Sequence, residues 1–180
     1  MEFINLISEK YLKSFSTIDL NVDAKMIVST IAFAQDMYIL PITGTDLLDE
    51  LTTQVSGNTI STSNEYLLDN FLKPCLAAYT VYELSDFLVF KFTNKSIEKQ
   101  KSDTSDPISL NELNHLKGKL LIRAQHLGEK MVKYLRGNST HYPLYLNGNN
   151  TEDKYKPSAS NINLNFYIPK RNGCDWGLGK

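Results

Sequence analysis

The stretch LPITGTDLLDEL, at residues 40–51, contains a proline and a glycine three positions apart. Proline lacks a backbone N–H and glycine adopts conformations closed to other residues, so both types interrupt helices. An apolar helical pattern ends at this point and a second one begins. Either Thr45 or Asp46 would cap the second helix by accepting backbone N–H bonds. The stretch therefore predicts a fixed corner, formed by Pro41, Gly44 and Asp46, at which two helices meet.

Helices are predicted on both sides of this corner from the spacing of apolar residues. Before it, apolar side chains recur at intervals of three or four, which predicts a helix over about 23–39. After it, a short helix is predicted over about 45–54, and a third over about 64–91. Pro74 falls inside that third helix, where it costs a hydrogen bond and clashes with an earlier carbonyl. We therefore expect a helix kink or break just before Pro74.

The last predicted helix begins at a capping box, in which Ser109 and Glu112 are three residues apart. Leucines then recur about every seven residues, as in the seam of a helical bundle. The predicted fold class is therefore mainly α, a small helical bundle with a long C-terminal arm that carries a β-strand. The chain divides into a lead-in (1–22), a bundle domain (23–140) and an extended arm (141–180).

The arm contains the clearest strand pattern, INLNFYI at 162–168, in which apolar and polar residues alternate. A single strand has unpaired backbone groups and is not stable alone. This one must pair with the segment 11–16, with a neighbouring copy or with another protein. The sequence thus predicts a partner-binding strand whose contact residues are Ile162, Leu164, Phe166, Tyr167 and Ile168.

Composition narrows the classes of protein to which the chain could belong. With 180 residues, 42% of them hydrophobic, it is long enough for one domain with a real core. We expect no membrane span, because no segment approaches ~20 apolar residues, and no secretory signal. Its two cysteines, Cys75 and Cys174, are far apart, and we expect reduced thiols and intracellular assembly. The net charge of −1 is unlike that of proteins that grip DNA phosphates, although a near-neutral wall would let a duplex slide.

A metal-binding helical bundle is one alternative, and it would be an enzyme or a metal-binding protein. Glu112 and His115 match a Glu-x-x-His half-site, and His126 and Glu129 repeat it in reverse order. A complete site would need a second such motif and carboxylates from other helices, which the sequence does not supply. Cys75 lies in an apolar run, which favours burial over nucleophilic chemistry. We therefore predict no catalytic residues, no metal and no cofactor.

A DNA-binding bundle is the second alternative, and it would use Lys95, Lys99 and Lys101. These lysines lie in a polar segment, 93–107, which also carries acidic residues. Such a mixture is typical of a solvated loop. The sequence has no nucleophile elbow, Walker loop or dinucleotide-binding fingerprint either.

Several short motifs resemble those of the tailed-phage head–tail connector proteins, also called adaptor or head-completion proteins, and most closely the ring proteins of crAss-like phages. The motifs are Ile31-x-x-Ala34-Gln35-x-x-Tyr38-Ile39-x-Pro41-Ile42-x-Gly44-x-x-Leu47, Phe71-Leu72-x-Pro74-x-Leu76-Ala77, Thr93-Asn94-Lys95 and Tyr142-Pro143-Leu144-Tyr145. Thr43 stands where the family usually has Leu, Leu48 where Tyr is common, and Ser96 where Gly is frequent. The resemblance covers about residues 20–145.

This resemblance implies a structural virion protein rather than an enzyme. It implies a homo-oligomeric ring of about twelve copies beneath the portal protein, at the neck of the particle. Genomic duplex DNA would pass through the lumen without specific binding, and further ring, tail or hub proteins would attach below. Assembly would take place in the host cytoplasm, without a membrane.

Overall fold

The computed structural model describes residues 4–92, 96–99, 108–147 and 157, and the protein is mainly helical, as predicted. The first elements are α1 (Glu9–Phe15), α2 (Ala24–Ala34), a π-helical turn η1 (Gln35–Ile39) and α3 (Leu40–Thr43). They are followed by α4 (Thr45–Ser56), α5 (Thr62–Leu67), a second π-helical turn η2 (Leu68–Leu72) and α6 (Lys73–Val89). The last are β1 (Phe90–Phe92), β2 (Ile97–Lys99), α7 (Leu110–Gly137) and α8 (Pro143–Asn147). The predicted strand at 162–168 lies outside the described residues.

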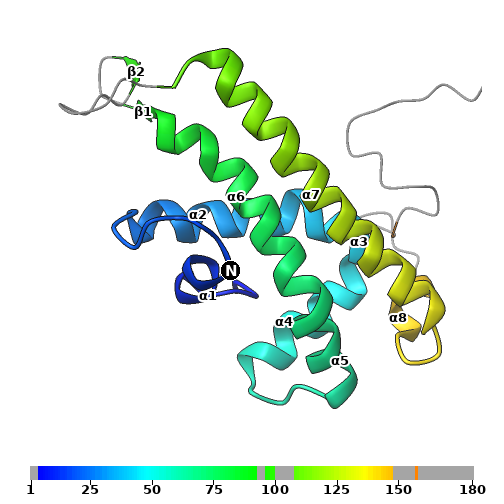
Figure 1. Cartoon of the computed structure of the whole chain (residues 1–180). Coiled ribbons are helices and arrows are strands. Elements are labelled where there is room, and N and C mark those ends of the chain that lie inside the picture. The colour runs from blue at the N-terminus through cyan, green and yellow to red at the C-terminus, as the bar shows by residue number, and fades with distance from the viewer. Residues whose placement is uncertain (1–3, 93–95, 100–107, 148–156, 158–180) are drawn as a thin grey trace, which may run out of the picture.

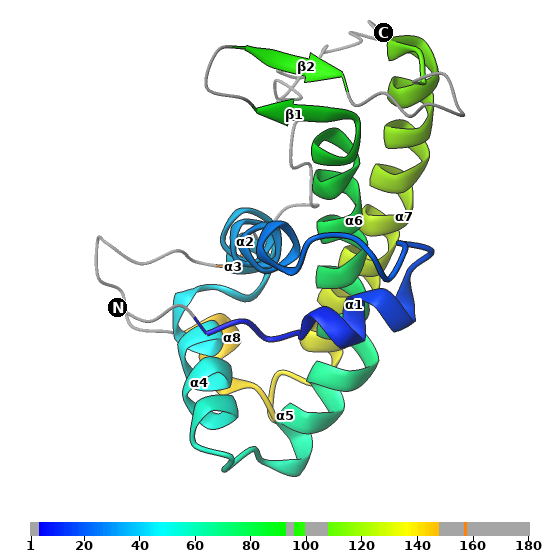
Figure 2. The same cartoon turned by 90° about the vertical axis from the view of Figure 1, so that its left-hand side faces the viewer.

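Helix α6 is the centre of the fold, because it packs against both α2 and α7 (Figures 1 and 2). The long helix α7 runs antiparallel to α6, and α2 crosses α6 from another direction. Lys117 of α7 forms an ion pair with Asp86 of α6, and its ammonium lies 4.6 Å from the centroid of the Tyr82 ring. Fully buried side chains fill the space between the helices, among them Ile27, Ile31, Leu72, Cys75, Leu76, Tyr79, Ala124, Met131 and Leu135.

Both prolines within the helical runs stand two residues after a π-helical turn. Leu40 N–H donates to the carbonyl of Gln35, five residues back, and Lys73 N–H donates to that of Leu68. Pro41 and Pro74 follow directly. A proline ring clashes with the carbonyl four residues earlier, and the wider π turn contains that carbonyl in each case. The sequence predicted a kink or a break just before Pro74, and the structure has a π turn there within a continuous helical run.

The predicted corner at 40–51 exists, but it differs from the prediction in two details. The first helical run continues through Pro41 and ends at Thr43, so proline does not stop it at residue 39. Gly44 makes the turn with φ 78°, a conformation that favours glycine, and its N–H donates to the Leu40 carbonyl at 2.8 Å.

The predicted cap of the second helix is also wrong. Gly44 occupies the N-cap position of α4, where there is no side-chain capping bond. Asp46 lies inside the first turn instead, where a negative charge is favourable beside the N-terminal end of the helix dipole. One glycine therefore ends α3 and begins α4, and leaves no room for a separate capping residue.

The last predicted helix is present as α7, and its predicted capping box at Ser109 and Glu112 is confirmed. Ser109 Oγ accepts from the N–H of Glu112 at 3.3 Å, and the Glu112 carboxylate accepts from the N–H of Ser109 at 2.9 Å. These bonds from Ser109 lower the pKa of Glu112, because they favour its charged form.

The sequence suggested a loop between α6 and α7, but part of this segment forms a β-hairpin. β1 and β2 pair in an antiparallel hairpin, with Phe90 opposite Lys99 and Phe92 opposite Ile97. Aromatic and β-branched residues favour this extended pairing at the start of a segment that is otherwise polar.

The bundle extends beyond residue 140, where the sequence placed the start of the arm. Tyr142 and Tyr145 are buried, and α8 packs against α4. The Tyr142 hydroxyl donates to the Ser63 carbonyl at 2.7 Å, which ties the start of the predicted arm to the N-terminal end of α5. Residues 142–147 therefore belong to the bundle.

The lead-in is also part of the packed structure. It contains α1, whose Leu12 is fully buried, and the backbone of Ile4 and Leu6 is held by the side chain of Gln35. Gln35 accepts from the N–H of Leu6 at 3.0 Å and donates to the carbonyl of Ile4 at 3.1 Å.

One helical run, Ala24–Thr43, is long and apolar enough by length and composition to cross a membrane. Its 20 residues contain a window with a mean hydropathy of 1.3, which corrects the expectation that no segment approaches a membrane span. Half of that window is buried inside the fold, and core helices meet the same criterion. The run supplies Ile27, Ile31 and Ile39 to the core around α6.

Two glycines should respond in opposite ways to replacement by alanine. Gly118 is exposed in α7 and has open space where a Cβ would lie, so Gly118→Ala should raise the free energy of unfolding by roughly 0.5–1 kcal/mol. Gly44→Ala should lower it by about 1–3 kcal/mol, because the positive φ strains any side chain. Urea unfolding followed by circular dichroism measures both. Equal effects of the two substitutions would contradict the assigned conformations.

Candidate functional site

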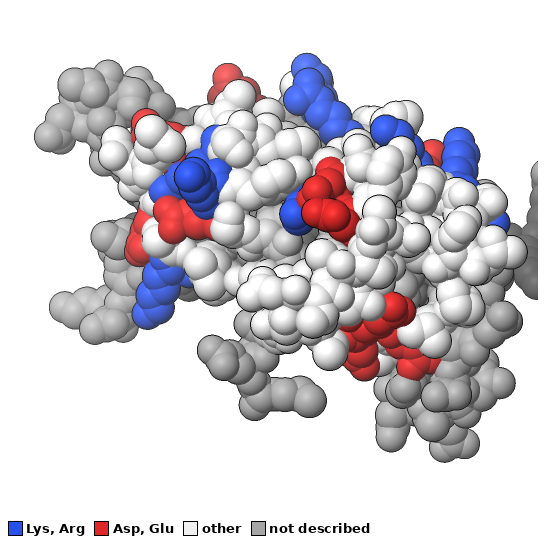
Figure 3. Space-filling view, turned by 90° about the horizontal axis from the view of Figure 1, so that it is seen from below, with Lys and Arg blue, Asp and Glu red and all other residues white. Residues whose placement is uncertain are grey.

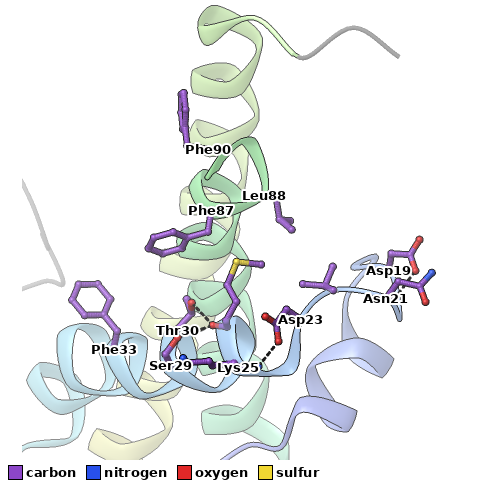
Figure 4. Close-up of a pocket in the computed structure, with 12 residues that line it drawn as sticks. Asp19, Asn21, Asp23, Lys25, Ser29, Thr30, Phe33, Phe87, Leu88 and Phe90 are labelled. Atoms are coloured by element: carbon purple, nitrogen blue, oxygen red, sulfur yellow. Dashed lines mark hydrogen bonds between the residues drawn. The ribbon is translucent and has the colours of Figure 1, made fainter. Parts of the chain in front are cut away.

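A groove lies between α2, along most of its length, and the C-terminal end of α6 (Figure 4). It has a volume of about 1040 Å³. Phe33 of α2 and Phe87 of α6 project into the space between the two helices, and Phe90 of β1 lies beyond them. Phe33 is 52% exposed and Leu88 is 39% exposed, and together with Phe87 they give the groove a contiguous apolar part. Contiguous apolar surface of this kind marks interaction sites.

The two ends of the groove differ in chemistry. The aromatic side chains lie at one end, and Asp19, Asn21 and Asp23 lie at the other (Figure 4). Asp23 caps α2, since its carboxylate accepts from the N–H of Lys25 at 2.9 Å. Asp19 accepts from the N–H of Asn21 at 3.0 Å in the preceding turn. These local bonds fix the carboxylates at the groove's rim. The groove therefore combines an aromatic end with a polar end that holds two carboxylates, Asp19 and Asp23, and the ammonium of Lys25.

The outward face of α7 has a different character. Ile122 is 67% exposed, and Lys119 and His126 lie three residues before it and four after it, on the same side of the helix. The helix is basic as a whole, with six Lys or Arg against two Glu in Leu110–Gly137. Glu129, seven residues after Ile122, is also exposed on this side. We call the residues Ile122, Lys119, His126, Glu129 and Lys133 the α7 outer face.

The groove and the α7 outer face lie on different sides of the α6–α7 pair. Asp86 of α6 points to α7, where it pairs with Lys117. Leu88 follows two positions later, which is about 200° around a helix, and it lines the groove. The groove therefore opens on the side of α6 away from α7, while Ile122 faces away from α6 in the other direction.

The residues of the corner and of the helix kink are structural. Gly44 is buried. Pro41 and Pro74 are half-buried, and each is the second residue of its helix. The five predicted contact residues of the arm, Ile162, Leu164, Phe166, Tyr167 and Ile168, lie outside the described residues, so the structure does not bring them to a site.

The histidines and carboxylates of the metal-binding alternative do not converge. His115, His126 and Glu129 are all exposed on α7, and Glu112 is engaged in the capping box. Within the described residues no group of three or more His, Cys, Asp or Glu side chains is placed to hold a metal ion.

The lysines of the DNA-binding alternative fall mostly outside the described residues. Lys95 and Lys101 are among those left undescribed, and Lys99 lies in β2. On the face of the bundle that Figure 3 shows, charged side chains of both signs lie in small groups between broad uncharged areas. That face offers no wide basic patch to a phosphate backbone.

Cys75 is fully buried in α6, as its apolar neighbours predicted. Burial raises the pKa of its thiol to about 12, because the thiolate would lose its hydration. Since the thiolate is the nucleophilic form, this environment is typical of a structural cysteine.

A group of tyrosines joins α6 to the π turn η1. The Tyr38 and Tyr79 rings stack with centroids 4.2 Å apart, and the Tyr38 hydroxyl donates to the Glu83 carboxylate. Burial, followed by this hydrogen bond, raises the pKa of Tyr38 far above its usual range. The group links the resemblance motif around Tyr38 to the central helix.

The chain matches the model of a family of unknown function, DUF6712, over residues 39–155, and it belongs to that family. The matched range begins just before the corner at Gly44 and includes α4 to α8. No curated protein and no solved structure matches the chain.

Sequence reasoning missed the groove and the α7 outer face. Phe33 and Ile122 fit helical patterns, and only the packing decides whether such residues face the core. A signal for Ile122 was available, since Lys119 and Arg123 flank it in the sequence.

The burial of Cys75 makes a prediction about labelling. On a Cys174→Ser background, iodoacetamide at pH 8 should modify the folded chain at least ~100-fold more slowly than the urea-unfolded chain, because so little thiolate is present. Mass spectrometry over a time course measures the rate. Similar rates in the folded and unfolded chains would contradict the burial of Cys75.

Proposed function

We propose that this protein is a structural subunit of a head–tail connector ring in the virion of a tailed phage. Copies of the chain pack side by side beneath the portal protein. Genomic duplex DNA passes through the lumen without specific binding, and tail or further ring components attach below. The chain has no enzymatic role in this proposal.

One observation carries the proposal: two different exposed surfaces lie on different sides of the α6–α7 pair. The groove is lined by Phe33 and Leu88, and the α7 outer face is centred on Ile122. A subunit with two distinct, complementary surfaces associates head to tail, and such contacts close into a ring when their rotation divides a full turn. The long helix and the helix interrupted before Pro74 would supply the wedge faces.

The resemblance to connector proteins adds support, because its motif residues have coherent places in this fold. Ile31, Ala34, Tyr38 and Ile39 are buried around α6, and Gly44 forms the corner. A shared set of core positions supports a shared fold, although a fold alone does not define a function.

The C-terminal arm provides the second contact in the proposal. Ile162, Leu164, Phe166 and Ile168 would form one face of a strand added to the sheet edge of a neighbouring copy or of the portal, with Tyr167 on the other face. The β1–β2 hairpin is a two-stranded sheet within the described residues, so it offers edges of the kind that accept a strand.

Electron microscopy of the purified protein, alone and mixed with portal protein, tests the proposal. We expect ring-shaped particles that stack on the portal with a common axis. A protein that stays monomeric with portal present, at all concentrations and salt conditions tried, would argue against the connector role.

Shortening the arm gives a second test. A chain without residues 158–180 should keep its helical circular dichroism and its unfolding midpoint, because the described helices end at Asn147, but it should no longer join particles. Leu164→Ser with Phe166→Ser should act in the same way. The matched control, Asn163→Ser with Asn165→Ser, changes the opposite face of the predicted strand and should assemble normally. Normal assembly of the shortened chain would remove the arm from the proposal.

A further inference from the structure

We infer that the α7 outer face of one copy docks in the α2–α6 groove of the next copy. This inference rests on the proposed ring and identifies the contact that builds it. The occupant of the groove is thus a second copy of this chain.

Apolar surface supplies the first argument. Ile122 is 67% exposed in the middle of α7, and Phe33 is 52% exposed at the aromatic end of the groove. A helix that lays an exposed apolar side chain into an apolar groove is a common recognition mode. Docking would cover both Ile122 and Phe33, each of which costs free energy while it faces water.

Charge supplies the second argument. The groove has Asp19 and Asp23 at one end, and α7 carries Lys119 one turn from Ile122. Asp19 and Lys119 are both exposed, so they would lie in the rim of the contact. Opposite charges in a rim fix orientation and favour the correct encounter.

The same charges disfavour the simplest alternative, a symmetric dimer formed through α7. A symmetric contact that sets Lys119 of one copy opposite Lys119 or Lys133 of the other is disfavoured, because like charges repel. The head-to-tail arrangement pairs the two unlike surfaces, and it leaves one groove and one α7 face open on each growing assembly.

Cysteine cross-linking tests the contact directly. On a Cys174→Ser background, Ile122→Cys and Phe33→Cys are made separately and mixed, then treated with a short bis-maleimide. The buried Cys75 is not expected to react. We expect a cross-linked dimer in the mixture and none in either variant alone. The chain that carries both substitutions should give a ladder of higher oligomers. A matched control pairs Phe33→Cys with Lys25→Cys, both on α2, and should give no ladder.

The outcomes separate this inference from the proposed function. Rings in the microscope without a cross-link between the two variants would overturn the inference and leave the ring proposal standing. A dimer from Ile122→Cys alone would also overturn it, because it would require a symmetric α7 contact. If neither rings nor cross-links form, both ideas fail together.

Charge reversal gives an independent measurement. Lys119→Glu and Asp19→Lys should each weaken self-association roughly five-fold in sedimentation, as expected for a rim pair. The double variant should recover to within about two-fold of the unaltered chain. If Lys119→Glu leaves association unchanged but abolishes salt-dependent binding of duplex DNA, the basic face serves nucleic acid and the inference is wrong.

Discussion

The packing of α6 against both α2 and α7 is the constraint on which the rest of the structure depends. α6 contributes Cys75, Leu76, Ala77 and Tyr79 as fully buried residues, so it has little surface left for solvent. Its two neighbours are therefore half-covered helices, each with one face on α6 and another face open. The groove forms where α2 meets the exposed end of α6, and the α7 outer face is what that helix leaves uncovered.

The same local feature, a π-helical turn, precedes both prolines in these helices. Pro41 and Pro74 each follow a π-helical turn, so the backbone stays helical although proline has no N–H to donate. The turn η1 also presents Gln35, whose side chain holds the start of the lead-in at Leu6 and Ile4. The π turn η1 thus contains both the residue that tolerates Pro41 and the polar side chain that bonds to the segment before α1, whose Leu6 and Ile7 are buried in the core.

The sequence predicted those features that depend on local chemistry, and it failed where packing decides. The capping box at Ser109 follows from two residues three apart, and the corner at Gly44 follows from a glycine between two apolar patterns. The sequence did not predict that Asp46 lies in the first turn of α4 and not at its N-cap, because a residue that can cap need not occupy the capping position. The two π turns could not be predicted, because the spacing of apolar residues in the sequence does not reveal them. The groove required knowledge of which face of α2 meets α6, and a single helical pattern does not contain that.

Because its motif residues are buried, the resemblance to connector proteins gives information about the fold and little about the contact surfaces. The motif residues Ile31, Tyr38 and Gly44 are buried, so they are constrained by packing whatever the protein binds. The residues that would contact another chain, Phe33 and Ile122 above all, are not part of any of those motifs. The residue types at buried positions are limited by close packing, whereas those at exposed contact positions are limited by the partner that they bind. Self-assembly would therefore depend on exposed apolar and charged residues, which form two unlike surfaces: the groove with Phe33 and Asp19, and the α7 outer face with Ile122 and Lys119.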